Sequence, residues 1–190
     1  MFTYPIDEEL HLRIITQKDA QEIFELIHEN RAYLKNWLGW LDQSTEVKDV
    51  QKNIHKNLLG FAIDSAIDTA IVYQGKIVGK IGFHTIDKSV KKAEIGYFLA
   101  EEYNGLGIMT RATEALVKIG FEHYQLHKIE IHCAEGNEKS QGIPKRLGFK
   151  QEGRIRSAEW LYDKYVNHYI FGLLREEWNE QLYKKVYGDK

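Results

Sequence analysis

A strand, a tight glycine turn and a helix follow one another over residues 92–124, and this order constrains the fold more than any other part of the sequence. Apolar residues alternate along the predicted strand, 92–99, which ends in a short acidic turn. Gly105 and Gly107 come next, and apolar residues at helical spacing begin directly after them. The first backbone N–H groups of that helix are free, and neither glycine carries a side chain that blocks a close approach. The turn is therefore predicted to hold a phosphate or pyrophosphate through its backbone.

The composition indicates one folded domain over residues 1–190. Apolar residues make up 43% of the chain, which is enough for a sizeable core. The 26 Lys and Arg residues nearly balance the 28 Asp and Glu residues, which argues against nucleic acid or a membrane surface as a partner. Cys133 is the only cysteine, and the first residues lack the basic start and apolar run of a signal peptide. We therefore expect a cytoplasmic, single-domain protein.

Strand and helix patterns occur along the chain without an internal repeat. Alternating patterns predict strands at 10–15, 69–73, 76–85, 92–99, 128–134, 149–160 and 166–173. Helical spacing predicts helices after Thr16 and at 31–41, 45–59, 108–124, 140–147 and 175–186. The expected fold class is α+β (mixed α/β), with a mostly antiparallel, twisted sheet of about six to seven strands flanked by helices.

Two local signals refine these elements. Thr16 and Asp19 stand three residues apart at the start of the first helix, as in a capping box. Pro144 falls within the helix predicted at 140–147 and removes one backbone donor. Because a proline is tolerated only near the first turn of a helix, we expect Pro144 to lie there.

Two familiar nucleotide-binding motifs fit the glycine turn poorly. A P-loop needs Gly-Lys-Ser/Thr at the end of the turn, whereas Ile108 follows Gly107. A dinucleotide fingerprint needs a third small residue near Thr110 and a parallel strand before the turn, whereas the preceding strands are predicted to be antiparallel. A tight turn without a ligand is the plainer interpretation of a glycine pair taken alone.

A third motif fits, and further blocks of sequence support it. The turn Tyr103-Asn104-Gly105-Leu106-Gly107-Ile108 resembles the acetyl-CoA-binding loop of the Gcn5-related N-acetyltransferase (GNAT) superfamily. Other blocks resemble its RimJ/RimL-type branch of ribosomal-protein N-terminal acetyltransferases: the tryptophan-rich 34–41, Asn137-x-x-Ser140, Leu147-Gly148-Phe149, Glu152-Gly153 and the ending 173–178. These blocks follow the family's order over nearly the whole chain. The resemblance implies a GNAT fold whose sheet is splayed at the acetyl-CoA strand.

Two positions depart from the family pattern. The loop usually opens with Gln or Arg, whereas Glu102 stands in that place here. We expect cofactor binding to survive, although weakened, because the backbone does most of the work of holding the diphosphate. The residue after the family's serine is often Asn, whereas here it is Gln141.

The resemblance implies acetyl-CoA as the cosubstrate and assigns residues to it. The implied cofactor-binding residues are Tyr97, Phe98, Leu99, Ala100, Tyr103, Asn104, Gly105, Leu106, Gly107, Ile108, Met109, Asn137 and Ser140. Asn137 would bind the pantetheine arm, and Ser140 would protonate the departing thiolate as a catalytic residue. The plainer interpretation of Ser140 is a helix N-cap. Lys145 and Arg146 could reach the 3′-phosphate or simply face solvent.

Acetyl transfer to an amine needs a base, and two carboxylates compete for this role. Glu159 matches the acidic residue proposed as the base in the RimJ/RimL-type branch. Glu94 occupies the place of an acidic residue that other GNAT branches use. The plainer interpretations are a solvated strand carboxylate for Glu159 and a salt bridge at the sheet edge for Glu94.

The acceptor side has weaker signals. Tyr33, Trp37 and Trp40 could form the floor of the acceptor site, although aromatic residues at this spacing are more often part of a core. His84 stands near the end of a predicted central strand and could line the cleft. The pair His123 and His127 lacks a third ligand, so we expect no metal site. Cys133 is expected in the core, because direct attack by an amine needs no acyl-enzyme.

The function expected from the sequence is acetyl-CoA-dependent transfer of acetyl to an amine by direct attack. The favoured acceptor is a protein N-terminal α-amine of the ribosomal Ser/Ala type, since an α-amine of pKa about 8 is partly neutral in the cell. The alternatives are a polyamine or other small amine as acceptor, and a non-catalytic acyl-CoA-binding protein. Aromatic residues near the N-terminal helices could also mark the face of a homodimer.

Overall fold

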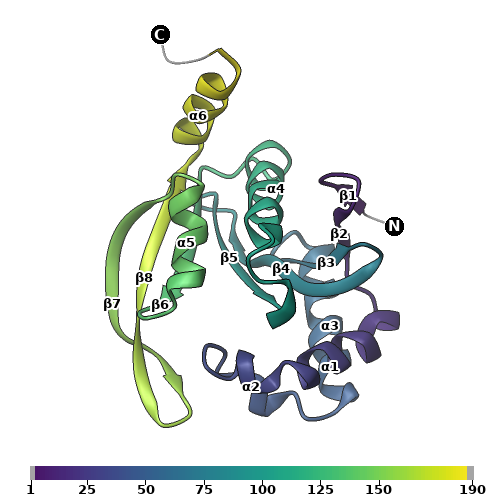
Figure 1. The fold of residues 1–190 in the computed structure, drawn as a ribbon. Helices are drawn as coiled ribbons and strands as arrows, with labels where there is room; N and C mark the ends of the chain where they lie inside the picture. Colours follow the sequence, from purple (N-terminus) through teal and green to yellow (C-terminus); the bar gives the residue numbers. More distant parts are fainter. Residues whose placement is uncertain (1–2, 188–190) are drawn as a thin grey trace.

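Eight strands form one sheet in the computed structural model, which describes residues 3–187 (Figure 1). Residues 1–2 and 188–190 of the expected domain lie outside the described part. The sheet order is β1-β2-β3-β4-β5-β6-β8-β7. The strands are β1 (Thr3–Pro5), β2 (Leu10–Ile14), β3 (Ile67–Tyr73), β4 (Lys76–Asp87), β5 (Lys92–Leu99), β6 (Lys128–Ala134), β7 (Lys150–Leu161) and β8 (Lys164–Leu174). The seven predicted strands are confirmed, and β1 is an eighth that is too short to give an alternating pattern.

The sheet is antiparallel except between β5 and β6, and these two strands separate partway along their length. Their parallel pairing runs only from Lys92↔Lys128 to Ile95↔Ile131. Beyond this point β5 continues to Leu99 and β6 to Ala134 without pairing with each other. The predicted mixed α/β fold and its splay at the acetyl-CoA strand are therefore confirmed.

Helices cover both faces of the sheet, and each face has its own core (Figure 1). The helices α4 (Ile108–Glu122) and α5 (Glu138–Arg146) pack on one face. The helices α1 (Ala20–Glu29) and α3 (Val47–Ala62) pack on the other, where α2 (Arg31–Leu34) follows α1. The C-terminal helix α6 (Arg175–Tyr187) follows β8 directly. Three short 3-10 turns, η1 (Gln17–Asp19), η2 (Leu41–Gln43) and η3 (Glu101–Tyr103), complete the described elements. No helix among residues 3–187 has the length and apolar character to cross a membrane.

The predicted helix at 31–41 is wrong beyond its first turn. The helix α2 ends at Leu34, and a turn leads from there to η2. The Asn36 side chain donates to the carbonyl oxygens of Ala32 (3.3 Å) and Tyr33 (3.0 Å), so it takes acceptors that a continuing helix would use. The aromatic residues after Asn36 therefore lie on a loop.

The expected place of Pro144 is also wrong, because α5 begins at Glu138 and Pro144 stands in its second turn. A proline there leaves the carbonyl of the residue four positions earlier, Ser140, without its helical N–H donor. The Tyr97 hydroxyl lies 3.1 Å from that carbonyl oxygen and donates to it. A side chain of β5 thus satisfies the acceptor that the proline left free.

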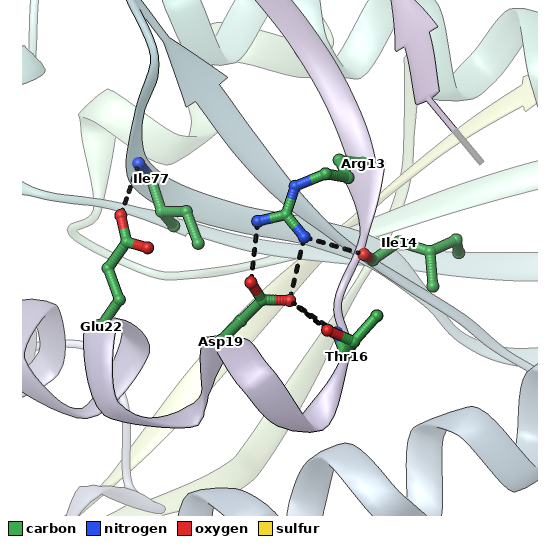
Figure 2. A network of polar contacts seen from close by, with 6 residues as sticks. All are labelled: Arg13, Ile14, Thr16, Asp19, Glu22 and Ile77. Carbon is green, nitrogen blue, oxygen red and sulfur yellow. Dashed lines mark hydrogen bonds and ion pairs between the residues drawn. The ribbon is translucent and has the colours of Figure 1, made fainter. Parts of the chain in front are cut away.

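A buried ion pair fixes the start of α1 against β2 (Figure 2). Both guanidinium Nη atoms of Arg13 donate to the carboxylate of Asp19, at 2.9 Å each. The backbone N–H and hydroxyl of Thr16 donate to the same carboxylate, which confirms the predicted capping box. Glu22, one turn further on, accepts a hydrogen bond from the backbone N–H of Ile77 on β4. This network fixes the N-terminal helices on the sheet.

We expect Asp19→Ala to lower the free energy of unfolding by about 2–4 kcal/mol, because it leaves Arg13 buried without a partner and removes the cap. Burial by itself raises the pKa of the Asp19 carboxyl, but the hydrogen bonds from Arg13 and Thr16 outweigh it and lower this pKa below its usual value. The stabilisation is therefore fully present above pH about 3.9 and is lost as the pH falls through the lower pKa of the folded state.

Urea unfolding at pH 7 and at a pH below about 3.9, the ordinary pKa of an Asp side chain, measures this loss. The exposed Asp163, in the turn between β7 and β8, is a matched control, and Asp163→Ala should change stability little. A loss of under about 0.5 kcal/mol for Asp19→Ala, the range of an ordinary surface change, would contradict the prediction.

Candidate active site

A cavity of about 450 Å³ lies where β5 and β6 separate. Its walls come from β4, β5, β6, β7, β8, α2 and the loop after it, the start of α4, and α5. Thirteen of the residues singled out from the sequence line it: Tyr33, Trp37, Trp40, His84, Glu94, Tyr97, Phe98, Leu99, Asn104, Met109, Asn137, Ser140 and Glu159. Six other predicted cofactor-binding residues do not line the cavity. They lie in the adjoining segment from the end of β5 to the first residue of α4: Ala100, Tyr103, Gly105, Leu106, Gly107 and Ile108. The tertiary structure thus brings the three candidate catalytic residues together in one cavity.

The glycine turn has the conformation that its sequence predicts. Gly105 and Gly107 have φ of +83° and +71°, and Gly107 is the N-cap of α4. No atom lies within 4 Å of the position where a Cβ would stand on either glycine. The start of α4 is therefore open to an anion that approaches its free N–H groups.

The splay leaves one edge of β5 free beside the cavity. The N–H of Ala100 donates to the carbonyl of Val78 on β4 (2.9 Å), so it is not available to a ligand. Backbone groups alternate in direction along a strand, so those of Tyr97 and Leu99 point to the opposite side, where β6 has moved away. Of the four consecutive residues expected to pair with the pantetheine arm, only these two present free backbone groups.

Ser140 lies within a set of short polar contacts on the α5 side of the cavity. Its backbone N–H donates to Oδ1 of Asn137 (3.1 Å), so Asn137 and not Ser140 caps α5. Its hydroxyl lies 3.1 Å from the hydroxyl of Tyr97 and 3.3 Å from Sγ of Cys133. Burial is the main cause that raises the pKa values of Tyr97 and Cys133, so both keep their protons at neutral pH. Ser140 therefore has neutral, protonated neighbours.

Glu159 lies on β7 and lines the same cavity, and both of its carboxylate oxygens have a partner. Its Oε2 lies 3.2 Å from Nε2 of His168 on β8, and its Oε1 accepts from the N–H of Gly39 at 3.3 Å. A Cβ on Gly39 would come within 3.1 Å of Oε1 and 3.0 Å of the Trp160 carbonyl oxygen, so any side chain here would be tight against the carboxylate. The loop after α2 therefore packs directly against the carboxylate.

Sequence reasoning missed His168 and Gly39. A signal for His168 was present, because the predicted hairpin of 149–160 and 166–173 already places Glu159 near the start of the partner strand. The register could not be read, since β7 has two irregularities, one of them between Ile155 and Glu159. Gly39 gave no signal, because its contact with Glu159 spans 120 residues.

Glu94 and His84 line the cavity on β5 and β4. The imidazole of His84 lies over Gly96, where a Cβ would come within 2.0 Å of the ring, so only glycine leaves room for it. Glu94 lies 3.6 Å from Nδ1 of His132 on β6, which also lines the cavity and was not singled out from the sequence. Glu94 is therefore not at an outer edge of the sheet, as its plainer interpretation assumed.

The aromatic residues after α1 line the cavity and are not fully buried. Trp40 is 36% exposed, and its ring lies 6.0 Å from that of Phe98. The hydroxyl of Tyr33 accepts a hydrogen bond from the side chain of Asn104, next to the glycine turn (3.2 Å). These contacts link the acceptor-side aromatic residues to the turn at the start of α4.

A family model for the acetyltransferase (GNAT) domain matches residues 9–150, three quarters of the described chain. The chain belongs to the GNAT acetyltransferase family. It is 33% identical to a putative ribosomal N-acetyltransferase, YdaF, of Bacillus subtilis, over 94% of this chain and 98% of that protein. It is 30% identical to the ribosomal-protein-serine acetyltransferase of Escherichia coli, over 88% and 94%. A solved structure of RimL, a ribosomal L7/L12 alpha-N-protein acetyltransferase in complex with coenzyme A, matches with a TM-score of 0.89 and 26% identity, over 93% of this chain and 99% of that one.

Membership of the GNAT family establishes the activity and the cosubstrate of this protein. It is an N-acetyltransferase, and its acetyl donor is acetyl-CoA. The non-catalytic alternative is thereby set aside. The structure fits the cosubstrate, since it offers an open helix start after two positive-φ glycines and a free strand edge beside the cavity.

Proposed function

We propose that this GNAT protein acetylates a protein N-terminal α-amine, of the kind that ribosomal proteins carry at an N-terminal Ser or Ala. The names of its relatives support a ribosomal-protein acceptor. The observation that carries the proposal is a single cavity that is lined both by Glu159 of β7 and by Ser140 of α5. A base and a proton donor on two sides of one reacting carbon are what direct aminolysis of a thioester requires.

The proposed roles follow from the contacts of each residue. Acetyl-CoA supplies the thioester when bound. Glu159 accepts a proton from the attacking amine, and Gly39 and His168 hold its carboxylate in place. Ser140 donates its hydroxyl proton to the departing sulfur and regains one from water, and the Tyr97 hydroxyl, 3.1 Å from the Ser140 hydroxyl, helps to hold that side chain in place. The free N–H groups of β5 orient the thioester and can receive the charge on its carbonyl oxygen.

Cofactor binding is assigned to the turn and the strand edge described above. The backbone from Asn104 to Ile108 would hold the diphosphate, with Met109 behind it, and the exposed Glu102 leaves this backbone free. Arg146 donates to the Thr110 hydroxyl on α4 (3.1 Å), which keeps its guanidinium near the turn and within reach of the 3′-phosphate. Lys145 lies over the ring of Phe171 and is the less favoured of the two.

A small amine such as a polyamine is the second candidate acceptor. Two carboxylates in the cavity, Glu94 and Glu159, favour it, because a polyamine carries further positive charges that would pair with them. The aromatic residues Tyr33, Trp37 and Trp40 accommodate either acceptor, since they offer apolar surface to a peptide and ring faces to a cation.

Mass spectrometry of products from a mixed acceptor panel tests the proposal. The panel contains peptides that begin with Ser or Ala, the same peptides with a blocked N-terminus and an internal Lys, and spermidine. We expect acetylation of the free N-terminal peptides at the α-amine. Exclusive acetylation of spermidine would favour the second candidate, and exclusive acetylation of the internal Lys would contradict both.

Two further proposals accompany this function, on the domain and on its location. We propose that residues 1–190 form a single N-acetyltransferase domain, since one sheet includes strands from both ends of the described chain. We propose a cytoplasmic location, because the single cysteine is a free buried thiol. A homodimer remains a prediction.

A further inference from the structure

Acetylation of an amine requires the removal of two protons, and Glu159 accounts for one. An amine arrives mainly as an ammonium, because its pKa of about 8 or above exceeds neutral pH. The ammonium must lose one proton before it can attack, and the nitrogen loses another after the new C–N bond forms. The C–S bond breaks in the same reaction, and the sulfur takes up one proton. Overall, one proton is therefore released to water. Because Glu159 takes only one of the two protons that leave the nitrogen, the other needs its own acceptor in the cavity.

A second carboxylate–histidine pair stands in the same cavity, apart from Glu159 and His168. Glu94 on β5 lies 3.6 Å from Nδ1 of His132 on β6, and both residues line the cavity. Glu94 is partly exposed there, whereas the ring of His132 is largely buried. The two pairs have the same composition but come from different strands: β5 and β6 hold one, and β7 and β8 hold the other.

His132 has an incomplete set of partners, which sets it apart from an ordinary buried histidine. Its Nε2 lies 3.4 Å from the carboxylate of Glu130, yet within the described residues this buried nitrogen makes no hydrogen bond. A buried nitrogen without a partner destabilises the folded state, so a function is one reason to keep it. The ring lies between two carboxylates, and neither contact is a short hydrogen bond. A group that gains and loses a proton needs such loosely held ring nitrogens.

Two carboxylates lie beside the ring of His132. Burial alone would raise the pKa of Glu130, but Lys128 and Lys92 outweigh it and lower this pKa, so Glu130 is an anion at neutral pH. It lies 3.4 Å from Nε2 of the ring, whereas Glu94 lies 3.6 Å from Nδ1, so each ring nitrogen has a carboxylate beside it. The charged and titratable groups that contact this cluster or line the cavity with it are Glu94, Lys92, Glu130, Lys128, Glu152, His84, Glu159 and His168.

We propose that Glu94 and His132 accept the first proton, the one that the arriving ammonium must lose before it attacks. Glu94 takes the proton from the N–H bond, whose electron pair stays on nitrogen, and passes it to Nδ1 of His132. The imidazolium then gives its proton back through the partly exposed Glu94 to water, and the pair returns to its starting state. Glu159 and His168 take the second proton after the C–N bond has formed and release it to water, which replaces the proton that Ser140 gives to the sulfur. This assignment gives both rival carboxylates a catalytic role, at different steps.

Acceptors of different basicity separate the two steps. The first pair is a peptide that begins with alanine and the same peptide that begins with trifluoroalanine, whose fluorines make the amine much less basic. The second pair is ethylamine and trifluoroethylamine. A weakly basic amine arrives neutral and has no first proton to lose, so it bypasses Glu94 and His132. Every variant is compared with the wild type on the same acceptor, which cancels the difference in nucleophilicity.

We expect Glu94→Gln and His132→Gln to lower kcat/KM by about tenfold or more with the ordinary amine, and to approach wild type with its fluorinated partner. Glu159→Gln should be impaired with both. His123→Gln, on an exposed histidine just after α4, is the matched control and should have no effect. Retained affinity for coenzyme A shows that each variant has folded.

An equal loss with both members of an acceptor pair would overturn the inference, since a merely structural role for His132 would affect both amines alike. The inference depends on acetyl transfer to an amine, which the family supplies, and not on which amine is the acceptor. If only the small amines are acetylated, the proposed peptide acceptor is wrong, and the ethylamine pair still decides the role of Glu94 and His132.

Discussion

Glu159→Gln lowers kcat for acetyl transfer by about a hundredfold or more and leaves the affinity for acetyl-CoA nearly unchanged. Glutamine keeps the size of the side chain, and its amide oxygen can still accept from the N–H of Gly39. It cannot take a proton from the amine, so the loss is confined to the transfer step. Steady-state kinetics with the best acceptor of the panel measure kcat, and isothermal titration measures cofactor affinity.

His168→Gln provides a graded comparison for the same site. It leaves the Glu159 carboxylate in place but removes the imidazole at 3.2 Å, so we expect a smaller loss of kcat than for Glu159→Gln. Glu25→Gln, on the exposed face of α1, is the control for loss of a carboxylate and should behave like the wild type. A Glu159→Gln variant with wild-type kcat would refute the assignment of the base.

Gly107→Val raises the Kd for coenzyme A by well over tenfold. Valine is strained at the φ of +71° that Gly107 adopts, and its branched side chain would enter the open space in front of α4, where the diphosphate is proposed to bind. Each tenfold loss corresponds to about 1.4 kcal/mol of binding free energy, so loss of a few backbone contacts is sufficient. Isothermal titration with coenzyme A measures the change.

Gly75→Val is a matched control for strain alone. Gly75 stands in the turn between β3 and β4 with φ of +81°, and like Gly107 it has open space where a Cβ would stand. It does not line the cavity, so its substitution should lower stability without a change in affinity. Equal affinities of Gly107→Val and Gly75→Val for coenzyme A would show that the diphosphate binds elsewhere.

Local patterns in the sequence predicted most of the fold. Alternation gave seven of the eight strands, and the capping box of Thr16 and Asp19 and the glycines before α4 have the predicted geometry. These features depend on neighbours within a few residues, which the sequence displays directly. The errors fell where another group competes for the backbone, as the Asn36 side chain does at the end of α2.

The sequence by itself therefore determined the fold family, the glycine turn and the list of candidate carboxylates and hydroxyls. Only the tertiary structure decided how these groups are paired. It set Glu159 against His168 and Gly39, placed Glu94 beside His132, and brought Tyr97 to the carbonyl that Pro144 leaves without a donor. Each of these contacts joins different strands, or a strand to a helix or loop. The contacts of Glu94 and Tyr97 depend on the splay of β5 from β6, and those of Glu159 depend on the irregular register of β7. No local pattern encodes such contacts, because they arise only when distant segments pack together.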